Sequence, residues 1–439
     1  MPENAKGEVL AHLTQARPPA LRHRVMAGYI GNVVEWYDFA LYGYLAGILA
    51  PVFFPPENPT AGLIATYGIF AAGFVMRPLG AAVFGWFGDL HGRARTMQIS
   101  VALMALPTLL LGLLPTYSQA GIVAPVLLVL VRLLQGLSVG GEFSSSATYL
   151  VETAPEGRRG LIGSWANIGS MSGSLLGVGM ATLTTVLFSA QDLADWAWRL
   201  PFLCGALLGA TAFAIRSKLH ESERFTQHND DRADTSPLFQ AFTTNRRETF
   251  LALGFAAAYG TDFYLTFVYL PEWLASQGLM DRSLALAINT GMTLLVIAAM
   301  PVFAVIGDRL VPRRTWIALA MGGLAIAAWP LHYWILQSDG SMAAVLVAHC
   351  CLFLLLAVPL GSGPALFVEM FPGEDRLSGY SVAFNLGMGV FGGLTPVIAS
   401  SLIAGTSVMT APAIYMAFTA LVGTVILAKI PDRSRSPLQ

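Results

Sequence analysis

Twelve long apolar stretches limit what this chain can fold into more than any other feature. Each is long enough to cross a hydrocarbon layer roughly 30 Å thick. Lipid offers the backbone no hydrogen-bond partners, so each stretch is expected to form a helix. The sequence therefore predicts an all-α membrane protein with 12 transmembrane helices, at about residues 24–53, 61–87, 97–115, 121–151, 161–188, 197–217, 249–275, 283–306, 315–336, 342–370, 377–402 and 410–430.

The composition excludes several functional classes. The 439 residues are 55% hydrophobic and 12% charged, and the net charge is −1. A soluble chain carries about twice this charge, and a neutral chain has no basic surface for nucleic acid. The sequence has no phosphate-binding glycine loop, no Ser/His/Asp arrangement and no Cys/His metal spacing. We therefore expect no enzyme, no metal, no cofactor and no nucleic-acid partner.

The positions of Lys and Arg predict the orientation in the membrane. With both termini on one side, all but four of the 25 basic residues fall in segments on that side. Arg199 and Arg282 fall on the opposite side, and Arg77 and Arg132 lie within spans. Basic residues accumulate in cytoplasmic segments. We therefore expect both termini in the cytoplasm.

The second half of the sequence repeats the first at a nearly constant offset. Four short matches recur in the same order, 217 to 224 residues apart, which indicates a duplicated six-helix unit. A charged stretch between the halves predicts a six-helix bundle at 1–217, a cytoplasmic linker at 218–247 and a second bundle at 248–439. The matches are Asp38-Phe-Ala-Leu with Asp262-Phe-Tyr-Leu, Gly88-Asp89 with Gly307-Asp308, Val151-Glu152-x-x-Pro155 with Val368-Glu369-x-x-Pro372, and Asn167-Ile-Gly169 with Asn385-Leu-Gly387.

Several segments also resemble a known family. Gly85-Trp-Phe-Gly-Asp-Leu-His-Gly-Arg-Ala-Arg95 is similar to the loop signature of the major facilitator superfamily, with Leu90 where an Arg is usual. The chain resembles the metabolite:proton symporter family within it, on Gly31-Asn-Val-Val-Glu-Trp-Tyr-Asp38, Arg77-Pro78, Arg132-Leu-Leu-Gln-Gly136 through Glu142, and Glu369-Met-Phe-Pro372. The resemblance implies a major facilitator fold and proton-coupled uptake of a small polar metabolite across the bacterial inner membrane.

Ionisable residues inside the spans are the candidates for binding and coupling, because charge in a membrane is costly without a partner or a function. Glu35 and Asp38 lie on one face of the first span, which Tyr42 continues. We expect these two acids to carry the coupling proton, and Asp38 to face a common cavity with Asp262. The candidates for binding substrate are Arg132, Arg77, Tyr42, Gln135 and Asp262.

The two arginines have two interpretations. A guanidinium stays charged, so it can hold a substrate carboxylate and release an acidic side chain to take up a proton. Alternatively, Arg132 forms a permanent ion pair with Glu35 or Asp38, and Arg77 makes a structural bond beside Pro78.

A third group of charges lies at the predicted cytoplasmic ends of the spans, where ion pairs can hold one conformation closed. We expect Glu152 to pair with Arg93 or Arg158, and Glu369 with Arg309, Arg313 or Arg376. The alternative is that they are solvated surface charges. The full set of expected gating residues is Asp89, Arg93, Arg95, Glu152, Arg158, Asp308, Arg309, Arg313, Glu369 and Arg376.

These features predict a monomeric, proton-coupled symporter in the bilayer that imports a mono-, di- or tricarboxylate by alternating access. One alternative is uptake of a zwitterion such as betaine or proline, whose cationic group Asp262 and Asp38 would bind. Another is a membrane sensor that binds without transport.

Overall fold

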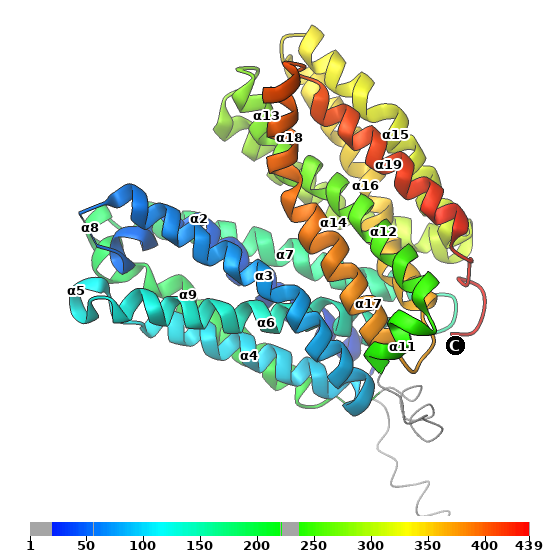
Figure 1. Cartoon of the computed structure of the whole chain (residues 1–439), viewed down its shortest axis with the longest axis horizontal. Helices are drawn as coiled ribbons and strands as arrows, with labels where there is room; N and C mark the ends of the chain where they lie inside the picture. The colour runs from blue at the N-terminus through cyan, green and yellow to red at the C-terminus, as the bar shows by residue number, and fades with distance from the viewer. Residues whose placement is uncertain (1–19, 56, 220, 222–236, 439) are drawn as a thin grey trace, which may run out of the picture.

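The computed structural model describes residues 20–438 except 56, 220 and 222–236, and every regular element among them is helical (Figure 1). Each predicted span matches one long helix, or two helices joined by a π-helical turn, and every predicted end lies within four residues of the observed one. The first half contains α2 (Leu21–Phe53), α3 (Pro59–His91), α4 (Arg93–Leu113), α5 (Tyr117–Ala120), α6 (Val123–Glu152), α7 (Arg159–Leu187), α8 (Ala190–Asp192) with a π-helical turn (Leu193–Ala197), and α9 (Arg199–Arg216).

The second half begins after the short helix α11 (Pro237–Thr243). Two of its spans contain π-helical turns, Leu265–Tyr269 between α12 and α13, and Asn385–Gly392 between α17 and α18. Its helices are α12 (Arg246–Tyr264), α13 (Leu270–Ser276), α14 (Arg282–Arg309), α15 (Arg313–Gln337), α16 (Met342–Met370), α17 (Arg376–Phe384), α18 (Gly393–Thr406) and α19 (Ala411–Lys429).

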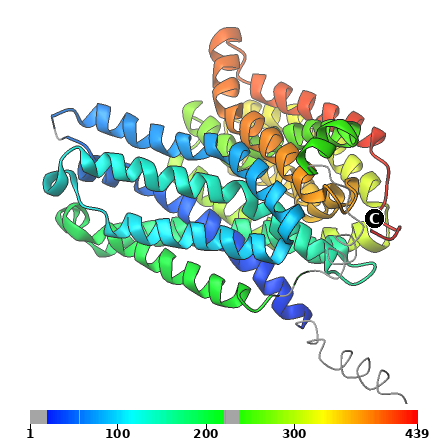
Figure 2. The same cartoon turned by 60° about the horizontal axis from the view of Figure 1, so that its bottom comes forward.

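The helices gather into two bundles that meet at one end and diverge at the other (Figures 1 and 2). In the first bundle α2 packs against α7, and α6 packs against α3 and α4. In the second, α15 and α12 pack against α19, and α16 against α14. The bundles touch where α7 packs on α14 and α16, and where α17 packs on α3 and α6. The predicted boundaries 1–217, 218–247 and 248–439 remain predictions.

Small residues let α2 and α7 approach closely. Ideal Cβ atoms on Gly169, Gly173 and Gly177 would lie 2.4–2.6 Å from backbone carbonyl oxygens of α2. These glycines recur every fourth residue and therefore share one helix face. Because these three residues have no side chain, α7 leaves space there for the backbone of α2.

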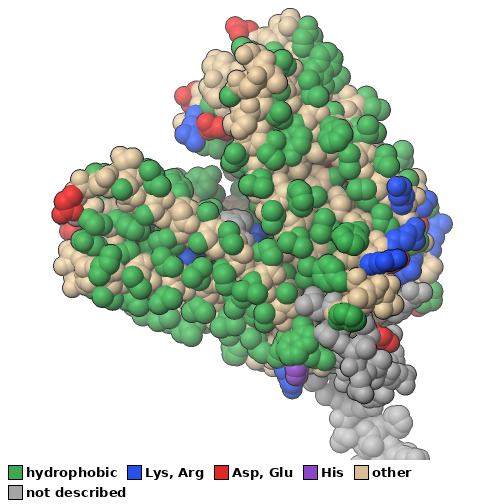
Figure 3. Space-filling model, in the orientation of Figure 1, with side chains coloured by type: hydrophobic (Ala, Val, Ile, Leu, Met, Phe, Trp, Pro, Cys, Tyr) green, Lys and Arg blue, Asp and Glu red, His purple; other side chains and the backbone are tan. Residues whose placement is uncertain are grey.

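Hydrophobic side chains are spread over much of the face that Figure 3 shows, and the charged side chains gather near the ends of the bundles. Val75, Val186 and Ile326 are each about three-quarters exposed (76–77%). Eleven helices, counted through the π-helical turns, are long and apolar enough to cross a membrane in the described part of the chain. The helix α2 is more polar because it carries Asn32, Glu35 and Asp38, which are all buried within the protein.

Candidate functional site

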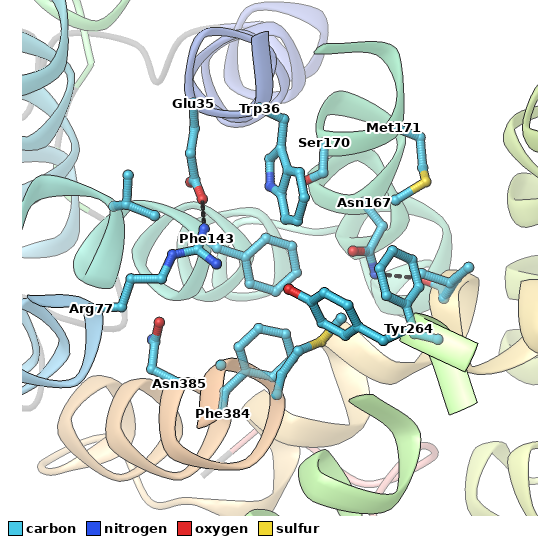
Figure 4. Close-up of a pocket in the computed structure, with 15 residues that line it drawn as sticks. Glu35, Trp36, Arg77, Phe143, Asn167, Ser170, Met171, Tyr264, Phe384 and Asn385 are labelled. Carbon is cyan, nitrogen blue, oxygen red and sulfur yellow. Dashed lines mark hydrogen bonds and ion pairs between the residues drawn. The ribbon is translucent and has the colours of Figure 1, made fainter. Parts of the chain in front are cut away.

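A central cavity lies between the bundles (Figure 4). Figure 3 shows a notch that separates the two bundles on the side away from the C terminus. Helices α2, α3, α6 and α7 line it from the first bundle, and α12, α16, α17 and the second π-helical turn line it from the other. Its lining residues are Glu35, Trp36, Arg77, Val139, Phe143, Asn167, Ser170, Met171, Phe263, Tyr264, Leu360, Phe384, Asn385, Met388 and Gly389.

An ion pair supplies the charge in this lining. Arg77 Nη2 lies 2.7 Å from Glu35 Oε1, and both side chains are buried. The guanidinium also lies over the rings of Phe39 and Trp36, at 4.9 and 5.6 Å from their centroids. Glu35 Oε2 has no hydrogen-bond partner among the described residues. The cavity therefore presents one guanidinium and one incompletely bonded carboxylate from the first bundle.

The second pair of predicted residues forms a separate network within the first bundle. Arg132 Nη1 donates to Asp38 Oδ2 at 2.7 Å and to Gln135 Oε1 at 2.8 Å. Gln135 Nε2 and the Thr108 hydroxyl donate to Asp38 Oδ1 at 2.9 and 3.0 Å. The Tyr42 ring lies 4.2 Å from the Arg132 guanidinium. Four predicted site residues thus lie together, joined by Thr108, which the sequence interpretation missed.

None of these four residues lines the central cavity. Asp262 does not line it either, because its carboxylate points to α19, where Thr419 Oγ1 lies 2.6 Å from Oδ1. The expectation that Asp38 and Asp262 face a common cavity is therefore wrong for this structure. Successive helix positions point about 100° apart, so the next residues, Phe263 and Tyr264, line the cavity instead.

Two asparagines of the cavity, which the site prediction missed, tie the bundles together. Asn167 on α7 donates to the Leu360 carbonyl of α16 at 2.7 Å. Asn385 in the π-helical turn donates to the Gly140 carbonyl of α6 at 2.9 Å. Asn167 and Asn385 are equivalent positions in one of the repeat matches, and this match is the sequence feature from which their paired role could have been predicted. Phe143 and Phe384 stack between them at 4.8 Å (Figure 4).

Where the bundles meet, four of the predicted gating residues form the first charge cluster. Glu152 Oε1 lies 2.8 Å from Arg376 Nη1 and 3.4 Å from Arg93 Nε. Arg93 Nη2 also lies 3.1 Å from Asp89 Oδ1. The Asp89 carboxylate accepts the backbone N–H groups of Leu377 and Ser378, at the start of α17. The cluster therefore joins α3, α4 and α6 to the second bundle.

A second charge cluster repeats this arrangement with the bundles exchanged. Arg313 pairs with Glu369 and, at 2.5 Å, with Asp308. Glu369 also pairs with Arg159 of α7 at 2.9 Å. Asp308 accepts the backbone N–H groups of Gly160 and Leu161 at 2.8 and 2.9 Å. The positive end of the α7 dipole favours this carboxylate.

Three details of the expected gating set are corrected. Arg376 pairs with Glu152 rather than Glu369, because α17 packs against α3 and α6 and its first residue therefore lies in the first charge cluster. Arg158, Arg309 and Arg95 are exposed, and no ion pair involves their side chains within the described ranges. Arg159 takes the place expected for Arg158. The sequence indicates this, because Arg159 and Arg376 are 217 residues apart, the same separation as in the Glu152–Glu369 match.

One more buried ion pair lies outside the predicted set of site residues. Arg216, one of the basic residues expected on the cytoplasmic side, is fully buried, and its Nη2 lies 2.5 Å from Glu142 Oε1. The Ser100 hydroxyl donates to the same carboxylate. A Cβ on Gly31 would lie 1.9 Å from the Arg216 guanidinium, so only glycine fits there without a shift. Arg216 is therefore a buried cation in addition to Arg77 and Arg132.

Polar groups outside the spans surround the clusters. Glu221 accepts the backbone N–H groups of Ala94 and Arg95, and burial raises its pKa. Burial also raises the pKa of Asp375 to about 6, although Asn245 donates to its carboxylate at 2.8 Å. Arg159 donates to the carbonyl groups of Ser434 and Ser436, so the C-terminal segment covers the second charge cluster.

The chain matches the sequence model of a family described as sugar (and other) transporters, over residues 25–243 and 232–439. It is 35% identical to the alpha-ketoglutarate permease of Escherichia coli K12 over 373 residues, covering 85% of each chain. It is 32% identical to the citrate-proton symporter of Klebsiella pneumoniae, with 93% of this chain and 91% of the relative covered.

A third relative, the proline/betaine transporter of Salmonella typhimurium, is 30% identical over 429 residues, with 95% of this chain and 85% of the relative covered. Among solved structures, the proton:xylose symporter XylE bound to 6-bromo-6-deoxy-D-glucose superposes with a TM-score of 0.76 at 18% identity, covering 95% of this chain and 97% of that one. The twelve-helix major facilitator fold and the predicted family resemblance are thereby confirmed. The chain belongs to the family described as sugar (and other) transporters, has the major facilitator fold and is a multi-pass membrane transporter.

Proposed function

We propose that the protein is a proton-coupled symporter that imports a small organic acid across the bacterial inner membrane. The observation that carries this proposal is the Glu35–Arg77 ion pair in the lining of the central cavity. The cavity lies where alternating access in this fold places a substrate, between the two repeats. Relatives named as a citrate-proton symporter and an alpha-ketoglutarate permease support the substrate class.

Competition for Arg77 explains the coupling. A substrate carboxylate that binds this guanidinium bidentately replaces Glu35 as its partner. Glu35 is then a buried carboxylate without its cation, which is strongly unfavourable, so it takes up a proton. Substrate and proton thus enter the cavity together. Arg132 and Asp38, which the sequence interpretation assigned to these tasks, act in this proposal as an internal support.

The two charge clusters close the cytoplasmic side. Most of the described Lys and Arg residues lie at the end where the bundles meet, which favours a cytoplasmic location for that end and for both termini. In each cluster, a carboxylate of one bundle holds the first turn of a helix from the other. These bonds must break before the cytoplasmic side opens. The structure then corresponds to a state open to the outside.

A second candidate substrate is a zwitterion such as betaine. The aromatic rings of Trp36, Phe143, Tyr264 and Phe384 surround the cavity beside Glu35 (Figure 4). Aromatic faces and a carboxylate bind a quaternary ammonium group, while Arg77 holds the carboxylate. Arg77 would bind a carboxylate of the substrate whether that substrate is an organic acid or a zwitterion.

Uptake by proteoliposomes tests the proposal. The labelled panel contains α-ketoglutarate, citrate, a monocarboxylate, proline and glycine betaine, with and without an inward proton gradient. We expect gradient-stimulated uptake of an acid in the wild type, loss of uptake in Arg77→Lys, and gradient-independent exchange in Glu35→Gln. Arg282→Ala is the matched control, because Arg282 forms an exposed ion pair with Glu272.

Uptake of betaine alone would move the substrate class to zwitterions. Specific binding without flux would favour a sensor, and normal gradient-driven uptake by both cavity variants would overturn the proposed site.

A further inference from the structure

Asp262 on α12 is a buried carboxyl group that the proposed coupling mechanism does not use. It is 0% exposed and forms no ion pair with any described residue. Oδ1 lies 2.6 Å from Thr419 Oγ1, and Oδ2 has no hydrogen-bond partner in the described part of the protein. A single neutral hydrogen bond compensates poorly for burying a full negative charge.

The hydrogen bonds around Thr419 are consistent with a neutral acid. Thr419 Oγ1 also lies 3.0 Å from the Tyr415 carbonyl, one helical turn earlier on α19. If Asp262 is protonated, its O–H donates to Thr419 Oγ1 and the threonine O–H donates to Tyr415. Both protons are then used, and the oxygen left over is a neutral carbonyl acceptor. If Asp262 is ionised, Thr419 is its one donor.

The repeat counterpart of Asp262 has the opposite environment. Asp38 receives hydrogen bonds from Arg132, Gln135 and Thr108. The position 217 residues after Arg132, which is the offset of the Glu152–Glu369 match in the same helix pair, is His349. The second half therefore has a titratable imidazole where the first has a fixed cation.

No charged side chain in the described part of the chain pairs with the Asp262 carboxyl. His349 Nδ1 interacts with the Val345 carbonyl, and its Nε2 is without a partner among the described groups. The remaining ionisable residues on the elements that pack against α12 are tyrosines, cysteines or residues at helix ends. They are Tyr415 and Lys429 on α19, Cys350, Cys351 and Glu369 on α16, Tyr269 in the π-helical turn Leu265–Tyr269, and Arg376 and Tyr380 on α17; α12 itself carries Arg246, Arg247, Glu248, Tyr259 and Tyr264.

The position of Asp262 connects it to the conformational change. Phe263 and Tyr264, the next two residues, line the central cavity. The π-helical turn Leu265–Tyr269 follows directly, and such turns in a membrane helix often mark functional sites. A movement of this segment against α19 would expose the carboxyl to water, where it loses its proton.

From this geometry we infer that Asp262 is a second proton-binding site, in the second bundle. Asp262 takes up a proton from the outside, stays neutral while it is buried, and releases the proton to water on the cytoplasmic side. This inference rests on the proposed function, with Glu35 as the first proton site. Two protons then accompany each substrate molecule.

The ratio of protons to substrate tests the inference. Proteoliposomes loaded with substrate are held at a series of membrane potentials and pH gradients, and the potential at which net flux reverses gives the ratio. We expect two protons per substrate for the wild type and one for Asp262→Asn, with substrate exchange retained. Glu272→Gln, an exposed acid, should keep the wild-type ratio. An unchanged ratio in Asp262→Asn would overturn the inference.

A measurement without transport keeps the inference separate from the proposed function. Infrared spectroscopy of the detergent-solubilised protein at neutral pH should show a carboxylic-acid C=O band that Asp262→Asn removes and Thr419→Val shifts. If uptake assays fail but this band is present, the proposed function fails while the neutral acid stands. If the band of the folded wild type does not depend on Asp262, the inference is wrong.

Discussion

Arg77 and Arg132 are both buried and both pair with a carboxylate of α2, yet their surroundings give them different tasks. Arg77 and Glu35 border an open cavity, where a ligand can reach the guanidinium. Arg132 and Asp38 are enclosed by Gln135, Thr108 and the ring of Tyr42. A buried pair with this number of hydrogen bonds is stable as a unit but costly to break. We therefore assign Arg132 to the integrity of the first bundle.

Replacing Arg132 tests this assignment. Arg132→Ala leaves the buried Asp38 carboxylate without its cation, which should lower the free energy of unfolding by about 3–5 kcal/mol. Thermal unfolding in detergent measures the loss, and Arg132→Ala combined with Asp38→Asn should recover much of it. Arg282→Ala, at an exposed pair, should change stability by less than about 1 kcal/mol. A stable Arg132→Ala protein that no longer binds substrate would contradict the assignment and favour the sequence-based role.

At the scale of helices, the contact between α2 and α7 depends on glycine. The backbone carbonyl of Val33 would lie 2.4 Å from a Cβ on Gly173, closer than any side chain tolerates. Gly179 lies on the same helix and has no neighbour within 4 Å of its Cβ position. The two positions therefore separate the effect of close packing from that of helix propensity.

We predict that Gly173→Ala lowers the free energy of unfolding by about 1–3 kcal/mol, because α7 must move away from α2. Gly179→Ala should be neutral or slightly stabilising, since alanine favours a helix by up to about 1 kcal/mol. Thermal unfolding of both variants in detergent is the measurement. Equal effects at the two positions would show that this contact is not tightly packed.

The loop before α17 should make stability depend on pH. Burial raises the pKa of Asp375 from an ordinary value of 3.8 to about 6, so the folded protein holds this proton more tightly than the unfolded chain. Stability should therefore fall as the pH rises from about 4 to 6, by about 3 kcal/mol, and stay level above. Asp375→Asn should remove this part of the pH dependence when unfolding is followed across the range. A difference between the two proteins that appears only above pH 6 would contradict the argument.

The sequence alone predicts the spans closely because a bilayer sets a minimum length for every apolar helix. Repeat matches also predict the charge clusters, since a duplicated bundle places equivalent residues at equivalent ends. The direction of a single side chain around its helix is not predicted this way, because an error of one residue turns it by about 100°. For that reason Asp262 was expected in the cavity, and Arg158 was expected where Arg159 lies.

At the scale of the whole molecule, the two bundles are joined by contacts related by the internal repeat. Each charge cluster, and each cavity asparagine, reaches from one bundle to the other. Between them, the hydroxyl oxygens of Ser144 on α6 and Ser381 on α17 lie 2.6 Å apart. Opening of the cytoplasmic side must separate this pair if the bundles move as units.

A cross-link at these serines should therefore stop transport. In a background without Cys204, Cys350 and Cys351, oxidation of the variant with both Ser144→Cys and Ser381→Cys should abolish uptake in proteoliposomes, and a reductant should restore it. The single-cysteine variants, treated in the same way, are the controls. Undiminished uptake by the fully cross-linked protein would show that this contact does not open during transport.

The central claim is that substrate displaces Glu35 from Arg77 and that Glu35 then takes up a proton. Binding of the identified substrate to purified protein in weakly buffered detergent solution, followed with a pH indicator, tests it most directly. The account predicts that wild-type protein takes up a proton for each substrate bound, and that Glu35→Gln binds substrate without this uptake. Substrate binding with no proton uptake in the wild type, or with the same uptake in Glu35→Gln, would contradict it.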